Sequence, residues 1–180
     1  DELKSGAVKA AIIAMLMICL YIFIRFRDWR YSLGTIIALL HDVLVTLAVF
    51  SFARKLVPFP LEIDQHFIAS VLTVIGFSMN DTVIVFDRIR ERLAEHVNAD
   101  ATNEERNTLI NYALNSTLSR TILTSLTVFF VLLVIFIFGG ESIRGFIFAL
   151  LIGRIIGTYS SLCISTPIVV DFDKGETTKK

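Results

Sequence analysis

The sequence lacks the marks of several common protein classes. Its 17 basic and 17 acidic residues leave a formal net charge of zero, so no general attraction to nucleic acid is expected. It has only two cysteines, Cys19 and Cys163, each within an apolar run and away from any cysteine or histidine cluster. This pattern indicates neither a disulfide framework nor a metal centre, and we expect no metal and no cofactor. A cleavable signal peptide is not recognisable either.

Apolar residues dominate the chain instead. Hydrophobic residues make up 54% of it and the mean hydropathy is +0.70, too high for an ordinary soluble domain of this length. A helix needs about 20 apolar residues to cross a bilayer. Five segments approach that length, and a soluble helical core would not need five in succession. We therefore predict an all-α polytopic membrane protein, a bundle of five transmembrane helices at residues 7–24, 32–53, 67–86, 122–138 and 146–170.

The connection over residues 87–120 is long and polar. Thr102 and Glu105 match a capping box that opens a new helix. Apolar residues then recur at helical spacing, which predicts an amphipathic cytoplasmic helix leading into the fourth span. A linker helix and an element that couples to a partner fit this pattern equally well.

The distribution of basic residues predicts the orientation. Eleven Lys and Arg residues lie in the first and third connections and the tail, and five lie in the N-terminal segment and the other connections. The richer side is expected in the cytoplasm. The N-terminus is then outside and the C-terminus inside, and we expect an earlier span or an extracytoplasmic domain upstream of residue 1.

Several charged or polar residues lie within the apolar segments. A carboxylate at mid-bilayer costs about 2.5–3.5 kcal/mol on insertion scales, so such residues usually face other helices or water and are often functional. Asp81 lies in the third span, where Asn80 adds a polar stripe with Gly76 and Thr73. This span therefore carries a polar seam around Asp81.

The fourth span carries a second seam, in which Thr117, Arg120, Thr124 and Thr127 share a helix face. We expect Arg120 to face Asp81 near the inner leaflet. A permanently charged Arg beside an Asp that changes protonation is a plausible proton relay. A static ion pair, or an Arg120 that snorkels to the lipid headgroups, fits the residues as well.

Three further residues complete the polar set. His41 and Asp42 lie in the second span, where Asp42 is the better functional candidate because it is deep, and His41 fits a packing role. Arg154 lies in the middle of the last span and should find a carboxylate or water. That span also repeats small residues every four positions, which favours close helix packing: Ala149, Gly153, Gly157, Ser161 and Ser165.

A series of motifs runs through the chain in order: "YIFIRFRDWR", "LLHDVLVT", "GFSMNDTVIVFDRIRE", "LSRTILTSLT", "FGG" and "IGTYSS". The series resembles the membrane portion of the SecD/SecF protein-export family of the RND (resistance–nodulation–division) superfamily. Within that family it resembles the SecF side, as a SecF subunit or as the SecF half of a fused SecDF chain.

The resemblance implies six spans per half with a periplasmic domain after the first, so that this chain starts at the second span. It implies proton-driven assistance of Sec-dependent export in the inner (cytoplasmic) membrane. Asp81 of the "ND" motif and Arg120 of the "SRT" motif would lie on the proton route, with Asp42 matching the "HD" motif. Arg154 departs from the family, which has an apolar residue there. Expected partners are SecD, the SecYEG translocon with YajC and YidC, preproteins and the lipid bilayer.

Other functions are open to the same residues. A different RND-type carrier that exports a lipid or drug would share the fold, and a passive scaffold subunit of a translocon would share the partners. An aspartyl protease could use Asp42 and Asp81 as its dyad. The "YD" and "GxGD" signatures of such proteases are absent from the sequence, so we do not expect an enzyme.

Overall fold

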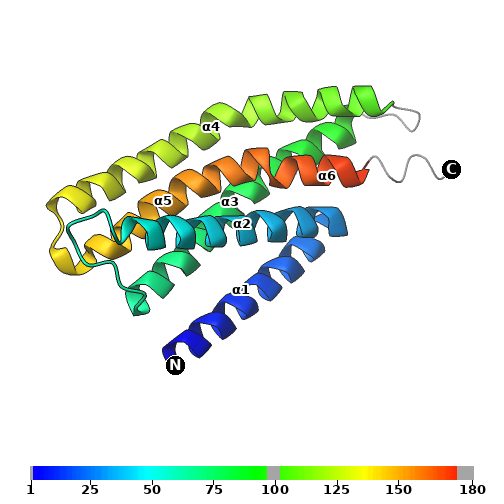
Figure 1. The fold of residues 1–180 in the computed structure, drawn as a ribbon. Helices are drawn as coiled ribbons and strands as arrows, with labels where there is room; N and C mark the ends of the chain where they lie inside the picture. Colours follow the sequence, from blue (N-terminus) through cyan, green and yellow to red (C-terminus); the bar gives the residue numbers. More distant parts are fainter. Residues whose placement is uncertain (1, 97–101, 174–180) are drawn as a thin grey trace.

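The computed structural model describes residues 2–96 and 102–173, which form a bundle of α-helices without a strand (Figure 1). Five helices are long and apolar enough to cross a membrane, when α5 and α6 are taken as one span. The expected multi-pass, all-α architecture is thus confirmed. The helices are α1 (Glu2–Phe26), α2 (Trp29–Ala53), α3 (Gln65–His96), α4 (Asn103–Phe138), α5 (Glu141–Cys163) and α6 (Ser165–Asp173).

Two of the helices are longer than a bilayer requires. α3 has 32 residues and α4 has 36, so at 1.5 Å per residue they are about 48 and 54 Å long. The hydrocarbon core of a membrane is only about 30 Å thick. Both helices are therefore longer than the hydrocarbon core that they would cross.

The start of α4 confirms the predicted capping box. The Thr102 hydroxyl accepts a hydrogen bond from the Glu105 N–H, and the Glu105 carboxylate accepts one from the Thr102 N–H. The predicted amphipathic helix and the fourth span are one continuous helix from this cap. Its early apolar residues Ile110 and Ala113 pack into a core cluster with Ile89 of α3.

The last predicted span consists of two helices. The segment expected as a single span over residues 146–170 lies within one candidate span, Glu141–Phe172, and its helix is interrupted at Ile164, between α5 and α6. Pro167 explains the break, because a proline has no N–H and its ring clashes with the carbonyl four residues earlier, here that of Cys163. At the junction, the Ser165 hydroxyl donates a hydrogen bond of 2.7 Å to the Ser161 carbonyl, which gives that carbonyl a hydrogen-bond partner.

The first connection and the described parts of the third, predicted to share one side of the membrane, lie at one end of the bundle (Figure 1). Arg25, in the last turn of α1, forms an ion pair with Asp87 of α3 at 2.9 Å. The rings of Trp29 and Phe172 of α6 make an edge-to-face contact, with centroids 5.5 Å apart. The loop over residues 54–64 and the turn at Gly139 and Gly140 lie at the other end. The tail lysines used in the orientation count, 174, 179 and 180, lie outside the described residues.

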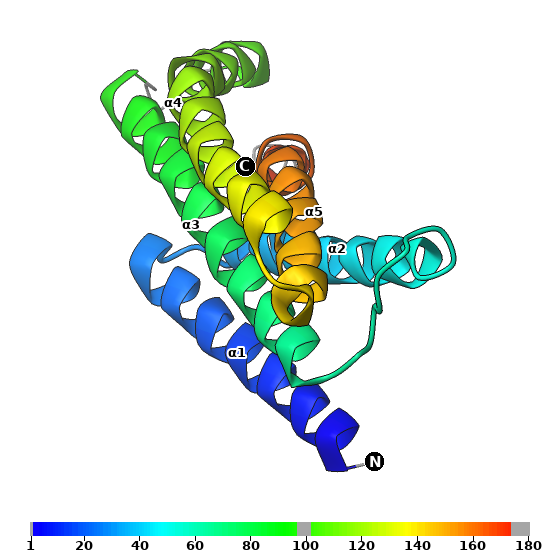
Figure 2. The same cartoon turned by 90° about the vertical axis from the view of Figure 1, so that its left-hand side faces the viewer.

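Helix α3 occupies the centre of the bundle, between α1 and α4 (Figure 2). It packs most extensively against α5, and glycines bring the two helices close together. A Cβ at Gly153 would lie 2.1 Å from Val74 Cγ2, and one at Gly157 would lie 3.2 Å from Ser78 Cβ. The predicted small-residue packing is thus confirmed, and the charged residues of α5 are brought directly against those of α3.

Candidate functional site

A buried ion pair joins α3 to α5 near the middle of the bundle. Arg154 Nη1 lies 3.0 Å from Asp81 Oδ2, and Arg154 Nη2 lies 3.5 Å from Asp81 Oδ1. The two side chains are only 4% and 3% exposed. A buried charge is tolerated when it is paired, and removing one partner is strongly destabilising. The expectation that Arg154 finds a carboxylate is confirmed.

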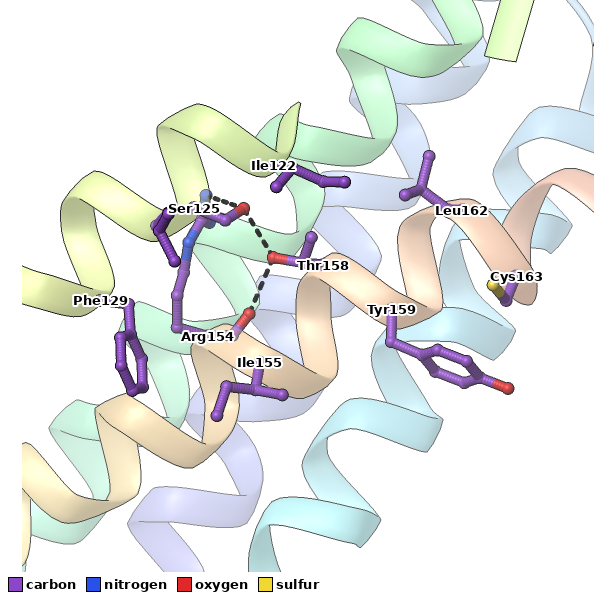
Figure 3. Close-up of a pocket in the computed structure, with 10 residues that line it drawn as sticks. Ile122, Ser125, Phe129, Arg154, Ile155, Thr158, Tyr159, Leu162 and Cys163 are labelled. Atoms are coloured by element: carbon purple, nitrogen blue, oxygen red, sulfur yellow. Dashed lines mark hydrogen bonds between the residues drawn. The ribbon is translucent and has the colours of Figure 1, made fainter. Parts of the chain in front are cut away.

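Arg154 also contacts α4. Its Nη2 donates to Ser125 Oγ at 2.9 Å, and the Ser125 hydroxyl is 2.7 Å from that of Thr158 (Figure 3). The Thr158 hydroxyl in turn donates to the Arg154 carbonyl. The guanidinium carbon lies 5.5 Å from the centre of the Phe77 ring, within range of a cation–π contact. One side chain from α5 thus connects α3 and α4.

Asp42 forms a second acidic site, on α2. Its carboxylate is fully buried, and Oδ2 accepts hydrogen bonds from Ser78 of α3 and from Ser160 of α5, the latter at 2.8 Å. Its other oxygen, Oδ1, lies 3.2 Å from His41 Nδ1. The His41 side chain is 33% exposed, at the edge of the site. Asp42 is thus buried inside the bundle, with His41 beside it at the edge, and a functional role for either residue stays a prediction.

The two acidic sites share the α3–α5 interface. Ser78, which binds Asp42, lies one helical turn before Asp81 on α3. Further along, Thr82 donates to the Ser161 hydroxyl at 3.0 Å, and that hydroxyl reaches the Ser78 carbonyl at 3.3 Å. A change in the spacing of α3 and α5 would therefore affect both acids together.

Arg120 does not face Asp81, so this predicted pairing is wrong. Arg120 is exposed and lines a polar cavity of about 420 Å³ with Asp87, Arg88 and Glu91 of α3. The reason is the rotation of α4. The residues of α4 that are buried include Thr117, Thr121 and Ser125. After Thr117, each of these follows directly on a residue of the predicted stripe, Arg120 or Thr124.

Two supporting residues also lie away from the ion pair. Thr124 is exposed, and its hydroxyl donates to the Arg120 carbonyl at 2.9 Å. Asn80 is exposed together with Gly76, on a face of α3 that no described helix covers. Whether Arg120, Thr124 and Asn80 act on a proton route stays a prediction.

Sequence reasoning missed the hydroxyl groups that complete both sites. Ser78 lies three residues before Asp81, and Thr158 lies four after Arg154, so their helical spacing from a charged residue was a readable signal. Ser125 and Ser160 could not be assigned in this way, because each binds a charge on another helix. Within residues 2–96 and 102–173, no group of three or more His, Cys, Asp or Glu side chains could hold a metal ion.

Comparison with known proteins agrees with this architecture. Residues 1–175 match the family model described as "Protein export membrane protein SecD/SecF, C-terminal". The chain is 50% identical to protein translocase subunit SecF of Rhodothermus marinus over 171 residues, which cover 95% of this chain and 54% of that protein. It is 41% identical to SecF of Helicobacter pylori, over 98% of this chain and 51% of that protein.

A solved structure is similar as well. The crystal structure of SecDF, a translocon-associated membrane protein from Thermus thermophilus, superimposes with a TM-score of 0.80 at 34% sequence identity. The match covers 96% of this chain and 22% of that one. The chain thus spans about half the length of its SecF relatives and a smaller part of SecDF. By its sequence and its helical bundle, the chain belongs to the SecD/SecF family of protein-export membrane proteins.

Proposed function

We propose that this chain is the membrane part of a SecF-type auxiliary subunit of the Sec translocon, which couples proton flow to late steps of protein export. The observation that carries the proposal is the pair of acids, Asp42 and Asp81, buried within the spans and joined through one helix interface. Intramembrane carboxylates of this kind typically mark ion or proton pathways. In this proposal Asp81 binds and releases the proton, and the chain performs no catalysis.

The energy available from one proton is sufficient for such coupling. A proton that crosses a potential of 100 mV gains about 2.3 kcal/mol. Since every 1.4 kcal/mol is a factor of ten, this shifts a two-state equilibrium about 50-fold. The bundle could use that shift to move elements outside the membrane.

The exposed face of α3 supports the proposed partners. Asn80 and Gly76 present a polar amide and a flat backbone surface within a span, where lipid alone would leave the amide without hydrogen bonds. We propose that SecD, or the SecD half of the same chain, covers this face. The SecYEG translocon with YajC and YidC, and the preprotein, complete the proposed assembly.

The proposed location is the cytoplasmic membrane, with Arg25 and Asp87 at the inner face. The N-terminus is then outside and the C-terminus inside, as the distribution of basic residues favours. Single cysteines placed near Lys9 and near Phe172 of the full-length protein should be labelled from opposite faces of intact cells. Labelling of both from the same face would contradict this orientation.

Asp81→Asn in the full-length protein tests proton coupling. Asparagine keeps the size of the side chain and an oxygen that can accept a hydrogen bond from Arg154, but it cannot titrate. With SecD and SecYEG in inverted membrane vesicles, the variant should assemble and support ATP-driven translocation, yet lose stimulation by the proton gradient. Full gradient-dependent export by this variant would refute the proposal.

A passive scaffold is the second candidate, and the way Arg154 ties α3, α4 and α5 together favours it. In that case Asp81→Asn would impair assembly instead of coupling. Quantifying the complex with SecD beside the export assay separates the two functions.

A further inference from the structure

The positive charge of Arg154 lies in direct contact with Asp81, the residue that is proposed to bind the proton. We infer that Arg154 is the positioning residue that holds Asp81 as a carboxylate, and that proton uptake exchanges this guanidinium for the proton. This inference rests on the proposed function, because it describes how Asp81 would work within it. The counter-ion of Asp81 is then Arg154 on α5, and not Arg120 on α4 as the sequence predicted.

The contact is close, but its geometry leaves it open to exchange. An ideal arginine–carboxylate pair has two parallel hydrogen bonds. Here the 3.0 Å approach of Nη1 to Asp81 Oδ2 lacks hydrogen-bond alignment, and the Nη2 bond to Oδ1 is long at 3.5 Å. Arg154 Nε has no hydrogen-bond partner among the residues that the structure describes. The shorter hydrogen bond of the guanidinium goes to Ser125 on α4.

The guanidinium has a place to go when Asp81 becomes neutral. Arg154 lines a groove of about 410 Å³ between α4 and α5, together with Ser125 and Thr158 (Figure 3). The groove is otherwise lined mainly by apolar side chains such as Ile122 and Phe129. The guanidinium would keep its hydrogen bond with the Ser125 hydroxyl there while it leaves α3.

The exchange balances in charge and atoms. A proton binds a carboxylate oxygen of Asp81 and the ion pair with Arg154 breaks. Arg154 stays protonated throughout, so the site gains one positive charge. An unpaired cation in this environment is costly, so proton release, which restores the pair, is favoured once the proton has an exit. In each cycle, α3 therefore loses and regains its ion pair with Arg154, while Arg154 keeps its hydrogen bond to α4.

The other charged groups around Asp81 are engaged elsewhere. From α2, Asp42 is bound by Ser78 and Ser160, with His41 beside it. On α4, Arg120 is exposed towards the polar cavity. On α3 itself, Asp87 is paired with Arg25 of α1. Within the described part of the chain, Arg154 is the one cation in ion-pair contact with Asp81.

The test is an infrared titration of the full-length protein with SecD in lipid nanodiscs. The carboxylic-acid band that disappears in Asp81→Asn belongs to Asp81. Arg154→Gln keeps a donor for Ser125 but removes the charge, so the neutral acid should persist to higher pH. We expect the midpoint of the band to move upwards by about 1–3 pH units, the usual effect of a neighbouring arginine on an aspartate. Arg154→Lys should restore most of the difference.

A matched control comes from the same helix. Arg144 lies in the first turn of α5 and near Phe59, at the end of the bundle with the Gly139–Gly140 turn. It is therefore away from the ion pair, and Arg144→Gln should leave the Asp81 midpoint unchanged. The pH profile of gradient-driven export should move with the midpoint in Arg154→Gln and not in the control. A midpoint that Arg154→Gln does not move would overturn the inference, even if export falls.

The unmodified protein provides a second test in case Arg154→Gln fails to fold. Isotope-labelled arginine shifts the guanidinium bands, and their pH dependence can be compared with that of the Asp81 band. Both should change at the same pH, because breaking the pair alters both groups. No change of any arginine band across the Asp81 titration would overturn the inference. Neither infrared test needs export, so either could fail while the Asp81→Asn export result still stands.

Discussion

Gly153→Ala should separate α3 from α5 and weaken the ion pair between them. The new Cβ would lie 2.1 Å from Val74 Cγ2, 2.8 Å from Cγ1 and 3.0 Å from Cβ. Rotating the valine cannot relieve the clash, because all three branching atoms are close and a β-branched side chain has one preferred rotamer in a helix. An ordinary contact begins at 3.4 Å, so the backbones must move apart by about 1.3 Å.

That displacement is large relative to the ion pair. If α5 moves as a rigid body directly away from α3, the Arg154–Asp81 contact of 3.0 Å lengthens beyond 4 Å, outside the range of an ion pair. Overpacking of this kind typically costs about 1–3 kcal/mol. We therefore expect a lower unfolding temperature in detergent and an Asp81 carboxylic-acid band that persists to higher pH.

Two further variants make the measurement specific. A Cβ at Gly76 would meet no neighbouring atom of the described residues within 4 Å. Measured on the protein without SecD, Gly76→Ala should therefore leave the Asp81 titration unchanged and be neutral or stabilising by up to about 1 kcal/mol, from helix propensity. Val74→Ala combined with Gly153→Ala should recover much of the lost stability, because it removes both Cγ atoms from the clash. Gly153→Ala with unchanged stability and an unchanged Asp81 titration would refute the reasoning.

The remaining predictions concern the other polar residues. Asp42→Asn should reduce gradient-driven export less than Asp81→Asn, because the amide oxygen can still accept hydrogen bonds from Ser78 and Ser160. Asp42→Leu should lower the unfolding temperature more than Asp42→Asn does. It leaves two buried hydroxyls without their acceptor, which costs about 1–3 kcal/mol each. Arg120→Lys should impair export less than Arg120→Ala, because it retains the charge at the polar cavity; equal loss in both variants would point to a need for the planar guanidinium. Neither Arg120 variant should change stability by more than about 0.5 kcal/mol in thermal unfolding, since the side chain is exposed.

Much of the architecture was predictable because it depends on local patterns. Five apolar segments of bilayer length predicted five spans, since a backbone in lipid must satisfy its hydrogen bonds within one helix. The capping box at Thr102 and Glu105 predicted where α4 begins, since its bonds join residues three apart. The break at Ile164 was also local, and Pro167 was the available signal.

The polar residues were identifiable for a similar reason. A charge within an apolar span is expensive wherever the helices lie, so Asp42, Asp81 and Arg154 were recognisable without a fold. The four-residue spacing of small residues likewise indicated a close helix contact on α5. Neither pattern contains information about which helix lies opposite.

Which cation pairs with Asp81 was decided by tertiary structure alone. Successive residues of a helix differ by about 100° in direction, so a rotation of one position takes Arg120 out of the α4 interface and brings Ser125 in. That rotation depends on the packing of α4 against both α3 and α5. The glycines of α5 then set the spacing that brings Arg154 within 3.0 Å of Asp81. The sequence by itself determined that buried charges had to be paired, and the helix rotations, set by packing over the whole interface, decided which ones pair.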